Sequence, residues 1–201
     1  MREGSKRIWT VPNALTMLRL LLIPVYWVLM MTKGNEKLAL VVFLIASVTD
    51  LVDGWIARHF DQMTDFGKLF DPLADKLMVL SVMLSLVLKG MLPVVPLIIL
   101  LLKEALMIYG GALMLRHQVV VYAKPIGKVA QFVIVCALIL SFFGDEFGAY
   151  PVHLIVLGIG LILTLYALYY YAHACLKAIR AQKQAELTTL EEEKHAAERD
   201  S

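Results

Sequence analysis

Charged residues are scarce in this chain. Lys, Arg, Asp and Glu make up 18% of its 201 residues, and 60% of the residues are apolar. A soluble globular domain is about one quarter charged, so the composition predicts a membrane protein. The formal net charge of +2 is too small to favour nucleic acid as a partner.

Cysteine is also nearly absent. The chain has two, Cys136 and Cys175, and both lie in apolar runs without a CxxC-type neighbour. This spacing argues against a disulfide framework or a zinc site. We expect both thiols to pack as small apolar side chains.

Long apolar runs dominate the rest of the sequence. A membrane-spanning helix needs about 20 residues, and six segments qualify, at residues 15–31, 38–56, 69–88, 94–115, 129–143 and 152–176. The expected fold class is therefore all-α: a polytopic membrane protein with six transmembrane helices. Polar residues interrupt the second and third segments.

Basic residues gather at one set of segment ends. They are Arg2, Lys6, Arg7, Arg58, Lys68, Arg116, Lys124, Lys128, Lys177, Arg180 and Lys183. The opposite ends carry only Lys33, Lys37 and Lys89. Because cytoplasmic loops are rich in Lys and Arg, we expect both the N- and the C-terminus in the cytoplasm, as an even number of spans requires.

The flanks of the apolar region differ from it in composition. Residues 8–11 suit a short interfacial segment, and Pro12-Asn13 is expected to break the chain before the first span. Past Arg180 large apolar residues become rare, which is typical of a solvated helix or a disordered tail. We expect a six-helix membrane catalytic domain over residues 1–183 and a charged cytoplasmic tail over 184–201.

Four aspartates, Asp50, Asp53, Asp71 and Asp75, interrupt the second and third apolar segments. One charged residue at the bilayer centre costs roughly 2.5–3.5 kcal/mol, so four exposed and independent ones would cost about 10–14 kcal/mol. Apolar packing cannot offset such a cost. The cluster therefore predicts a positively charged partner.

The spacing brings the four carboxylates together. Asp50 and Asp53 share one helix face, as do Asp71 and Asp75, and the short polar connection between the two helices makes them antiparallel neighbours. Oxygen ligands of this kind suit Mg²⁺ or Mn²⁺. Two such cations would form a template for displacement at phosphorus.

Residues between the two pairs support a ligand site. Gly54 and Gly67 remove side chains where a ligand could approach the backbone, Ala57 is small, and Arg58 offers a fork of donors for phosphate. The alternative is a structural helix pair whose aspartates are neutralised by nearby cations, namely Arg58, Lys68 and Lys76.

The pattern Asp50-x2-Asp53-Gly54-x2-Ala57-Arg58-x8-Gly67-x3-Asp71-x3-Asp75 resembles the signature of the CDP-alcohol phosphotransferases at every position. The resemblance implies a six-helix membrane enzyme, often a homodimer, that transfers a phosphatidyl group from a CDP-linked lipid to an alcohol and releases CMP. It also implies two divalent cations as cofactors.

The same resemblance implies roles for individual residues. Asp50, Asp53 and Asp71 would be metal ligands, and Asp75 would be a metal neighbour and the general base. The cytidine diphosphate would lie against the small and basic positions of the signature, namely Gly54, Ala57, Arg58 and Gly67.

The run from Pro12 to Arg19, Pro-Asn-Ala-Leu-Thr-x2-Arg, resembles the opening of family members that use glycerol phosphate. Asn13 and Thr16 would lie near the nucleotide, although both also suit a plain helix start. Arg19 would hold the donor phosphate, unless it extends to the interface.

An acceptor that carries a phosphate needs further cations. The candidates are Arg116, Lys124 and Lys128, of which Lys128 is preferred because Gly127-Lys128 resembles the start of the fifth helix in glycerol phosphate-using relatives. Ordinary membrane topology also explains these charges. Lys103, where relatives carry Arg, lies beside Glu104 inside a span and would contact substrate or form a structural ion pair.

The expected function is transfer of a phosphatidyl group from CDP-diacylglycerol to sn-glycerol 3-phosphate, at the cytoplasmic face of the cell membrane. Alternatives within the class use inositol phosphate, serine or, as in cardiolipin synthase, phosphatidylglycerol. A small cation transporter is the alternative outside it, but its polar groups would follow a path across the membrane.

Overall fold

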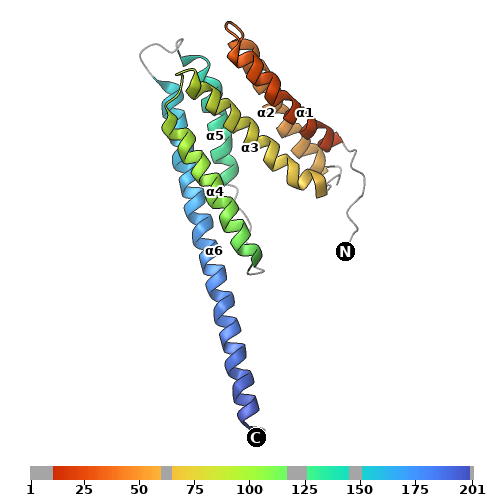
Figure 1. The fold of residues 1–201 in the computed structure, drawn as a ribbon, viewed down its shortest axis with the longest axis vertical. Helices are drawn as coiled ribbons and strands as arrows, with labels where there is room; N and C mark the ends of the chain where they lie inside the picture. The colour runs from red at the N-terminus through yellow and green to blue at the C-terminus, as the bar shows by residue number, and fades with distance from the viewer. Residues whose placement is uncertain (1–10, 60–64, 117–125, 145–150, 200–201) are drawn as a thin grey trace. The chain divides into compact units, whose positions relative to one another are not determined.

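All regular structure in the described residues is helical. The computed structural model describes residues 11–59, 65–116, 126–144 and 151–199. Within them lie α1 (Val11–Met31), α2 (Glu36–His59), α3 (Asp65–Leu88), α4 (Val94–Arg116), α5 (Ile126–Ser141) and α6 (Val152–Arg199) (Figure 1). Each helix contains most of one predicted apolar segment, so the all-α prediction is confirmed.

In the part of the chain that the structure describes, three stretches are long and apolar enough to cross a membrane: Asn13–Met31, Val94–Met114 and Val152–Gln184. The helix Ile126–Ser141 is apolar but shorter. The stretches belong to α1, α4 and α6, whereas α2 and α3 carry the aspartates. Length and composition therefore support a membrane protein.

The start of α1 and the end of α6 can be compared with what the sequence predicted for Pro12-Asn13 and for the charged tail. α1 begins at Val11, so the predicted break at Pro12-Asn13 is wrong. Pro12 lies in the first turn, where its missing N–H would have had no helical partner. At the other end of the chain α6 continues to Arg199, so a helix, and not a disordered tail, follows the last span. The boundary at residue 183 stays a prediction.

The chain divides into two compact units. The first comprises Met1–Leu97 and Ile134–Leu157, and the second comprises Ile98–Val133 and Gly158–Ser201. The first unit contains α1, α2 and α3, and the second contains most of α4 and α6.

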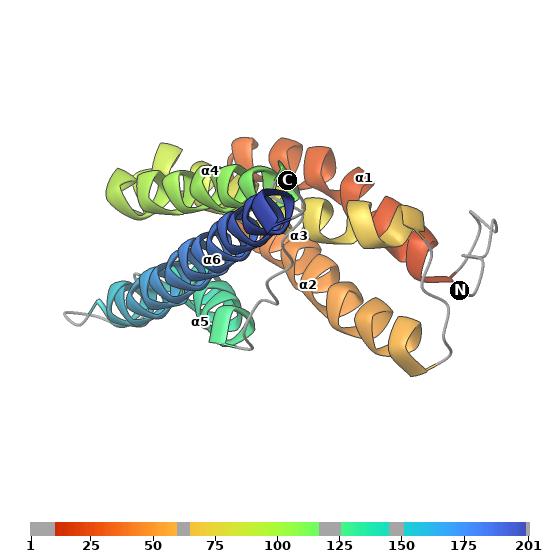
Figure 2. The same cartoon turned by 90° about the horizontal axis from the view of Figure 1, so that it is seen from below.

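In the first unit, α1 packs along both α2 and α3, whereas α2 and α3 touch each other over a much shorter stretch. Figure 2 shows α2 and α3 separating toward the end of α2 and the start of α3. The hydroxyls of Tyr26 and Ser85, both fully buried, lie 2.6 Å apart and join α1 to α3. α1 therefore forms the common support for the two acidic helices.

The opposite ends of α2 and α3 are tied together. Lys89, just after α3, places its Nζ 2.7 Å from a carboxylate oxygen of Glu36, the first residue of α2. The hydrogen bond from Lys89 lowers the pKa of Glu36. Gly90, at φ 74°, ends α3 there, and the N–H of Met91 bonds to the Leu86 carbonyl at 2.9 Å. The pair confirms that α2 and α3 are antiparallel.

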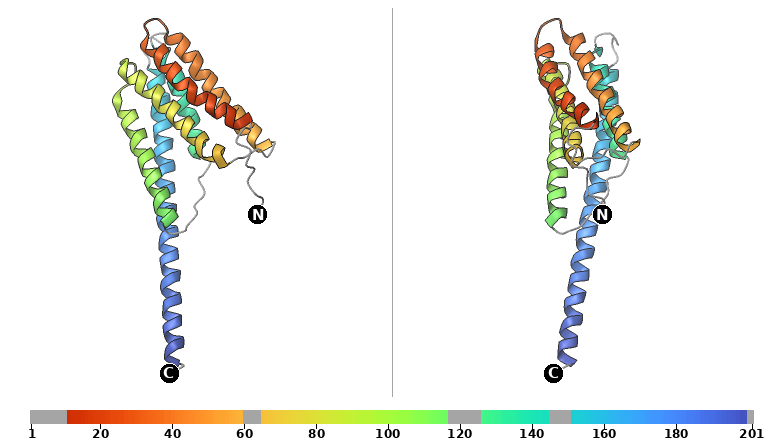
Figure 3. Two further views of the ribbon diagram at one scale, coloured as in Figure 1. Left: turned by 45° about the vertical axis from the view of Figure 1, so that its right-hand side comes forward. Right: turned by 90° about the vertical axis from the view of Figure 1, so that its right-hand side faces the viewer.

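In the second unit, α4 and α6 lie side by side, and α6 continues well past the end of α4 (Figure 3). The Tyr171 hydroxyl lies 3.3 Å from the Met114 sulfur. Gly110 faces the same tyrosine so closely that a Cβ there would lie 3.2 Å from its Cε1. Both cysteines are free and Cys175 is buried, as the sequence predicted.

Candidate active site

One face of α1 is polar and fully enclosed. Asn13, Thr16 and Arg19 recur at every third position and are 4%, 0% and 1% exposed. Apolar side chains of the same helix, such as Leu21 and Val28, are 67% and 68% exposed. Polar groups inside and apolar groups outside are the pattern of a helix surrounded by lipid.

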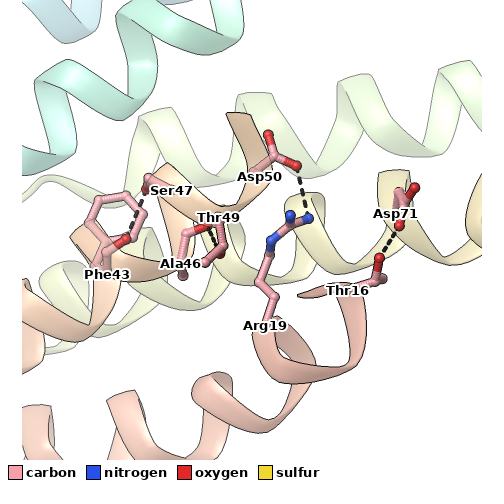
Figure 4. A network of polar contacts seen from close by, with 8 residues as sticks. All are labelled: Thr16, Arg19, Phe43, Ala46, Ser47, Thr49, Asp50 and Asp71. Atoms are coloured by element: carbon pink, nitrogen blue, oxygen red, sulfur yellow. Dashed lines mark hydrogen bonds and ion pairs between the residues drawn. The ribbon is translucent and has the colours of Figure 1, made fainter. Parts of the chain in front are cut away.

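This face of α1 meets the two acidic helices. Figure 4 shows Arg19 reaching Asp50 on α2 while Thr16, one turn earlier, reaches Asp71 on α3. Arg19 Nη1 lies 2.8 Å from Asp50 Oδ1. The Thr16 hydroxyl donates a hydrogen bond to Asp71 Oδ1. One turn of α1 thus holds one carboxylate from each helix.

Asp50 and Asp71 keep capacity for a further ligand. The Asp50 side chain is 36% exposed although its partner Arg19 is enclosed, and Asp71 is half-buried. The two carboxylates are held by side chains of α1 that lie one turn apart. Two accessible, negatively charged carboxylates are suitable ligands for a hard divalent cation.

The hydroxyls that precede Asp50 are satisfied within α2. Ser47 donates to the carbonyl of Phe43 at 2.9 Å, and Thr49 donates to the carbonyl of Ala46 at 2.8 Å. Because both bonds are local, they leave the Asp50 carboxylate to Arg19 and to any bound ligand.

The other predicted residues of the signature are only partly described. Asp75 lies on α3, half-buried, one turn after Asp71. The remaining positions lie outside the residues whose side chains are described: Asp53, Gly54, Ala57, Arg58 and Gly67. Within the described part of the chain, no three His, Cys, Asp or Glu side chains come together, so the four-aspartate site stays a prediction.

The predicted acceptor-binding residues belong to the second unit. Arg116 is exposed at the end of α4, Lys128 is exposed in the first turn of α5, and Lys124 lies outside the described residues. Lys103 pairs with the carboxylate of Glu104, and both are largely enclosed. The structural ion pair, one of the two alternatives for Lys103, is therefore present.

Sequence reasoning missed the partner of Asp50. The alternative of neutralisation considered Arg58, Lys68 and Lys76. Among the described side chains, which do not include Arg58 and Lys68, the cation paired with Asp50 is Arg19. The regular spacing of Asn13, Thr16 and Arg19 on an otherwise apolar helix was the available signal. It indicates a polar face but not which helix that face meets.

A sequence model of the CDP-alcohol phosphatidyltransferases matches residues 9–166, which include both acidic helices and the polar face of α1. The chain belongs to the CDP-alcohol phosphatidyltransferase family. It is therefore an enzyme, a membrane transferase of phospholipid biosynthesis, and the transporter alternative is wrong.

Three relatives illustrate the similarity. The chain is 33% identical to a Rickettsia felis protein named CDP-diacylglycerol--glycerol-3-phosphate 3-phosphatidyltransferase, over 83% of this chain and 96% of the relative. It is 30% identical to the Bacillus subtilis protein of the same name, over 78% and 90%. It is 31% identical to a Streptomyces coelicolor cardiolipin synthase (CMP-forming), over 73% and 71%.

Proposed function

We propose that this enzyme transfers the phosphatidyl group of CDP-diacylglycerol to sn-glycerol 3-phosphate and releases CMP. The observation that carries the proposal is its similarity to relatives named for this reaction, which the chain matches over 96% and 90% of their lengths. The cardiolipin synthase of S. coelicolor is matched over 71%, so phosphatidylglycerol is the second candidate acceptor.

The proposed topology has six spans, with both termini and the active site at the cytoplasmic face of the cell membrane. The distribution of Lys and Arg supports this orientation. The nucleotide would enter from the cytoplasm while the acyl chains of the donor stay in the bilayer. We also propose that the enzyme forms a homodimer, because the family resemblance implies one.

Two divalent cations, Mg²⁺ or Mn²⁺, would be held by Asp50, Asp53, Asp71 and Asp75. The accessible carboxylates of Asp50 and Asp71 support this assignment. When bound, the cations would neutralise charge that develops on the diphosphate. Gly54, Ala57, Arg58 and Gly67 would border the nucleotide, together with Asn13 and Thr16 on α1.

In the proposed reaction the acceptor hydroxyl attacks the phosphatidyl phosphorus, and Asp75 takes the hydroxyl proton. The bond from that phosphorus to the bridging oxygen breaks, and CMP leaves with the electron pair. A base need only lie within hydrogen-bond reach of the proton that it removes. Lys128, Lys124, Arg116 and Lys103 are the proposed acceptor contacts. The family resemblance also implied a donor-phosphate contact for Arg19, which the structure instead places against Asp50.

The test is CMP release by purified enzyme from CDP-diacylglycerol labelled in its cytidine. Each reaction contains Mg²⁺ and one acceptor: glycerol 3-phosphate, phosphatidylglycerol, serine or inositol phosphate. We expect release that depends on glycerol 3-phosphate. Release only with another acceptor would contradict the acceptor assignment and leave the reaction class intact.

A further inference from the structure

Arg19 is the one charged residue in the sequence of α1, and its side chain is enclosed. Its guanidinium, 1% exposed, keeps its charge under all physiological conditions. Burying such a group is tolerable only with a charged partner, which Asp50 supplies at 2.8 Å. The guanidinium therefore pairs with a carboxylate of the protein.

The two carboxylates held by α1 receive different partners. Asp50 meets a full positive charge from Arg19, whereas the partner of Asp71 among the described side chains is the neutral hydroxyl of Thr16. A cation approaching the two carboxylates is therefore attracted less strongly on the Asp50 side, where Arg19 offsets the negative charge, than on the Asp71 side.

The charge of Arg19 also bears on how the helices assemble. α2 and α3 touch each other little and both rest on α1. Because α1 holds the like-charged Asp50 and Asp71 one turn apart, the two carboxylates repel each other. A fixed positive charge between α1 and α2 offsets that repulsion before any metal ion is bound.

We propose that Arg19 is a positioning residue that acts through Asp50: it keeps the acidic helices assembled without metal and, by its charge, weakens the binding of divalent cations. This inference rests on the proposed function, because it requires Asp50 to be a metal ligand. It assigns Arg19 a role different from contact with the donor phosphate.

The test measures Mn²⁺ binding to the purified, full-length protein in detergent by electron paramagnetic resonance. Removing the charge with Arg19→Gln is expected to lower the half-saturating Mn²⁺ concentration by about tenfold or more, because a nearby like charge is lost. The same variant is expected to unfold at a lower temperature than the wild type in the absence of metal.

Two matched variants separate charge from structure. Arg19→Lys keeps the charge and is expected to restore the wild-type half-saturating concentration. Thr16→Val removes the neutral contact to Asp71 without changing the charge, so it is expected to leave Mn²⁺ binding unchanged or weaken it. The proposal would be overturned if Arg19→Gln bound Mn²⁺ no more tightly than the wild type. It would also be overturned if Arg19→Lys bound Mn²⁺ as tightly as Arg19→Gln.

If Arg19→Gln does not fold, the double variant Arg19→Gln/Asp50→Asn is used, since it also removes the uncompensated carboxylate. Recovery of folding supports the proposal, and a double variant as unstable as the single one overturns it. A wild type that binds no Mn²⁺ would refute the metal chemistry of the proposed function. A wild type that binds Mn²⁺ while Arg19→Gln gains no affinity refutes only the role of Arg19.

Discussion

Two ion pairs inside the helical segments differ in how far apart their partners lie along the chain. In the first unit Arg19 of α1 meets Asp50 of α2, whereas in the second unit Lys103 meets Glu104, its neighbour on α4. The first pair exists only when two helices are in place. The second needs a single helix, so it lowers the cost of inserting two charges without specifying any arrangement of helices.

The comparison predicts that function is concentrated where charges are gathered from several helices. Asp75→Asn, in the first unit, is expected to lower CMP release by about 10²–10⁴-fold, the usual contribution of a general base. CDP-diacylglycerol should still bind in the presence of metal, since the substitution keeps the size of the side chain. Turnover and donor binding are measured on the same preparation.

Near wild-type turnover in Asp75→Asn would exclude a base role for this residue. Loss of donor binding together with turnover would assign Asp75 to binding instead of proton transfer.

Breaking the ion pair between Lys103 and Glu104 in the second unit is expected to have a moderate effect on stability. Lys103→Met or Glu104→Gln alone removes one charge of this largely enclosed ion pair, which is expected to lower the free energy of unfolding by about 3 kcal/mol. The double variant should lose less, because neither charge is left. Thermal unfolding in detergent measures all three variants.

The same variants distinguish the two roles considered for Lys103. If it only pairs with Glu104, the double variant recovers both stability and the wild-type KM for glycerol 3-phosphate. If Lys103 contacts the acceptor, the KM stays raised in the double variant although stability recovers.

The smallest effect is expected where α4 meets α6. Replacing a helical glycine by alanine stabilises a helix by about 0.5–1 kcal/mol, and Gly111→Ala should show this gain because no atom lies within 4 Å of its new Cβ. Gly110→Ala should lose part or all of it, since its Cβ would lie 3.2 Å from Tyr171 Cε1. Equal melting temperatures for the two variants would show that the tyrosine moves aside freely.

The sequence was sufficient to predict the helices and insufficient to predict their neighbours. Apolar runs placed the helices because each must satisfy its backbone hydrogen bonds internally. Packing in lipid leaves little trace in such runs, so the packing of α1 against both α2 and α3 was not predictable. The prediction that the chain breaks at Pro12-Asn13 was wrong, because Pro12 lies in the first turn of α1 and starts the helix.

The candidate site was predictable to the same degree. The spacing of Asp50, Asp71 and Asp75 within the family signature identified the acidic helices, and Thr16 and Arg19 were singled out by their own motif. The direct contacts between the two motifs, Arg19 to Asp50 and Thr16 to Asp71, are tertiary. No periodicity within one segment encodes them.

The unbroken course of α6 has a mechanical consequence. Its 48 residues, at about 1.5 Å each, form a rod of roughly 72 Å, more than twice the hydrocarbon thickness of about 30 Å. With one end embedded, the rod is a lever: tilting the span by about ten degrees would swing a free arm of roughly 40 Å through several ångströms. A fluorophore on the last turn would therefore amplify small movements of the buried end.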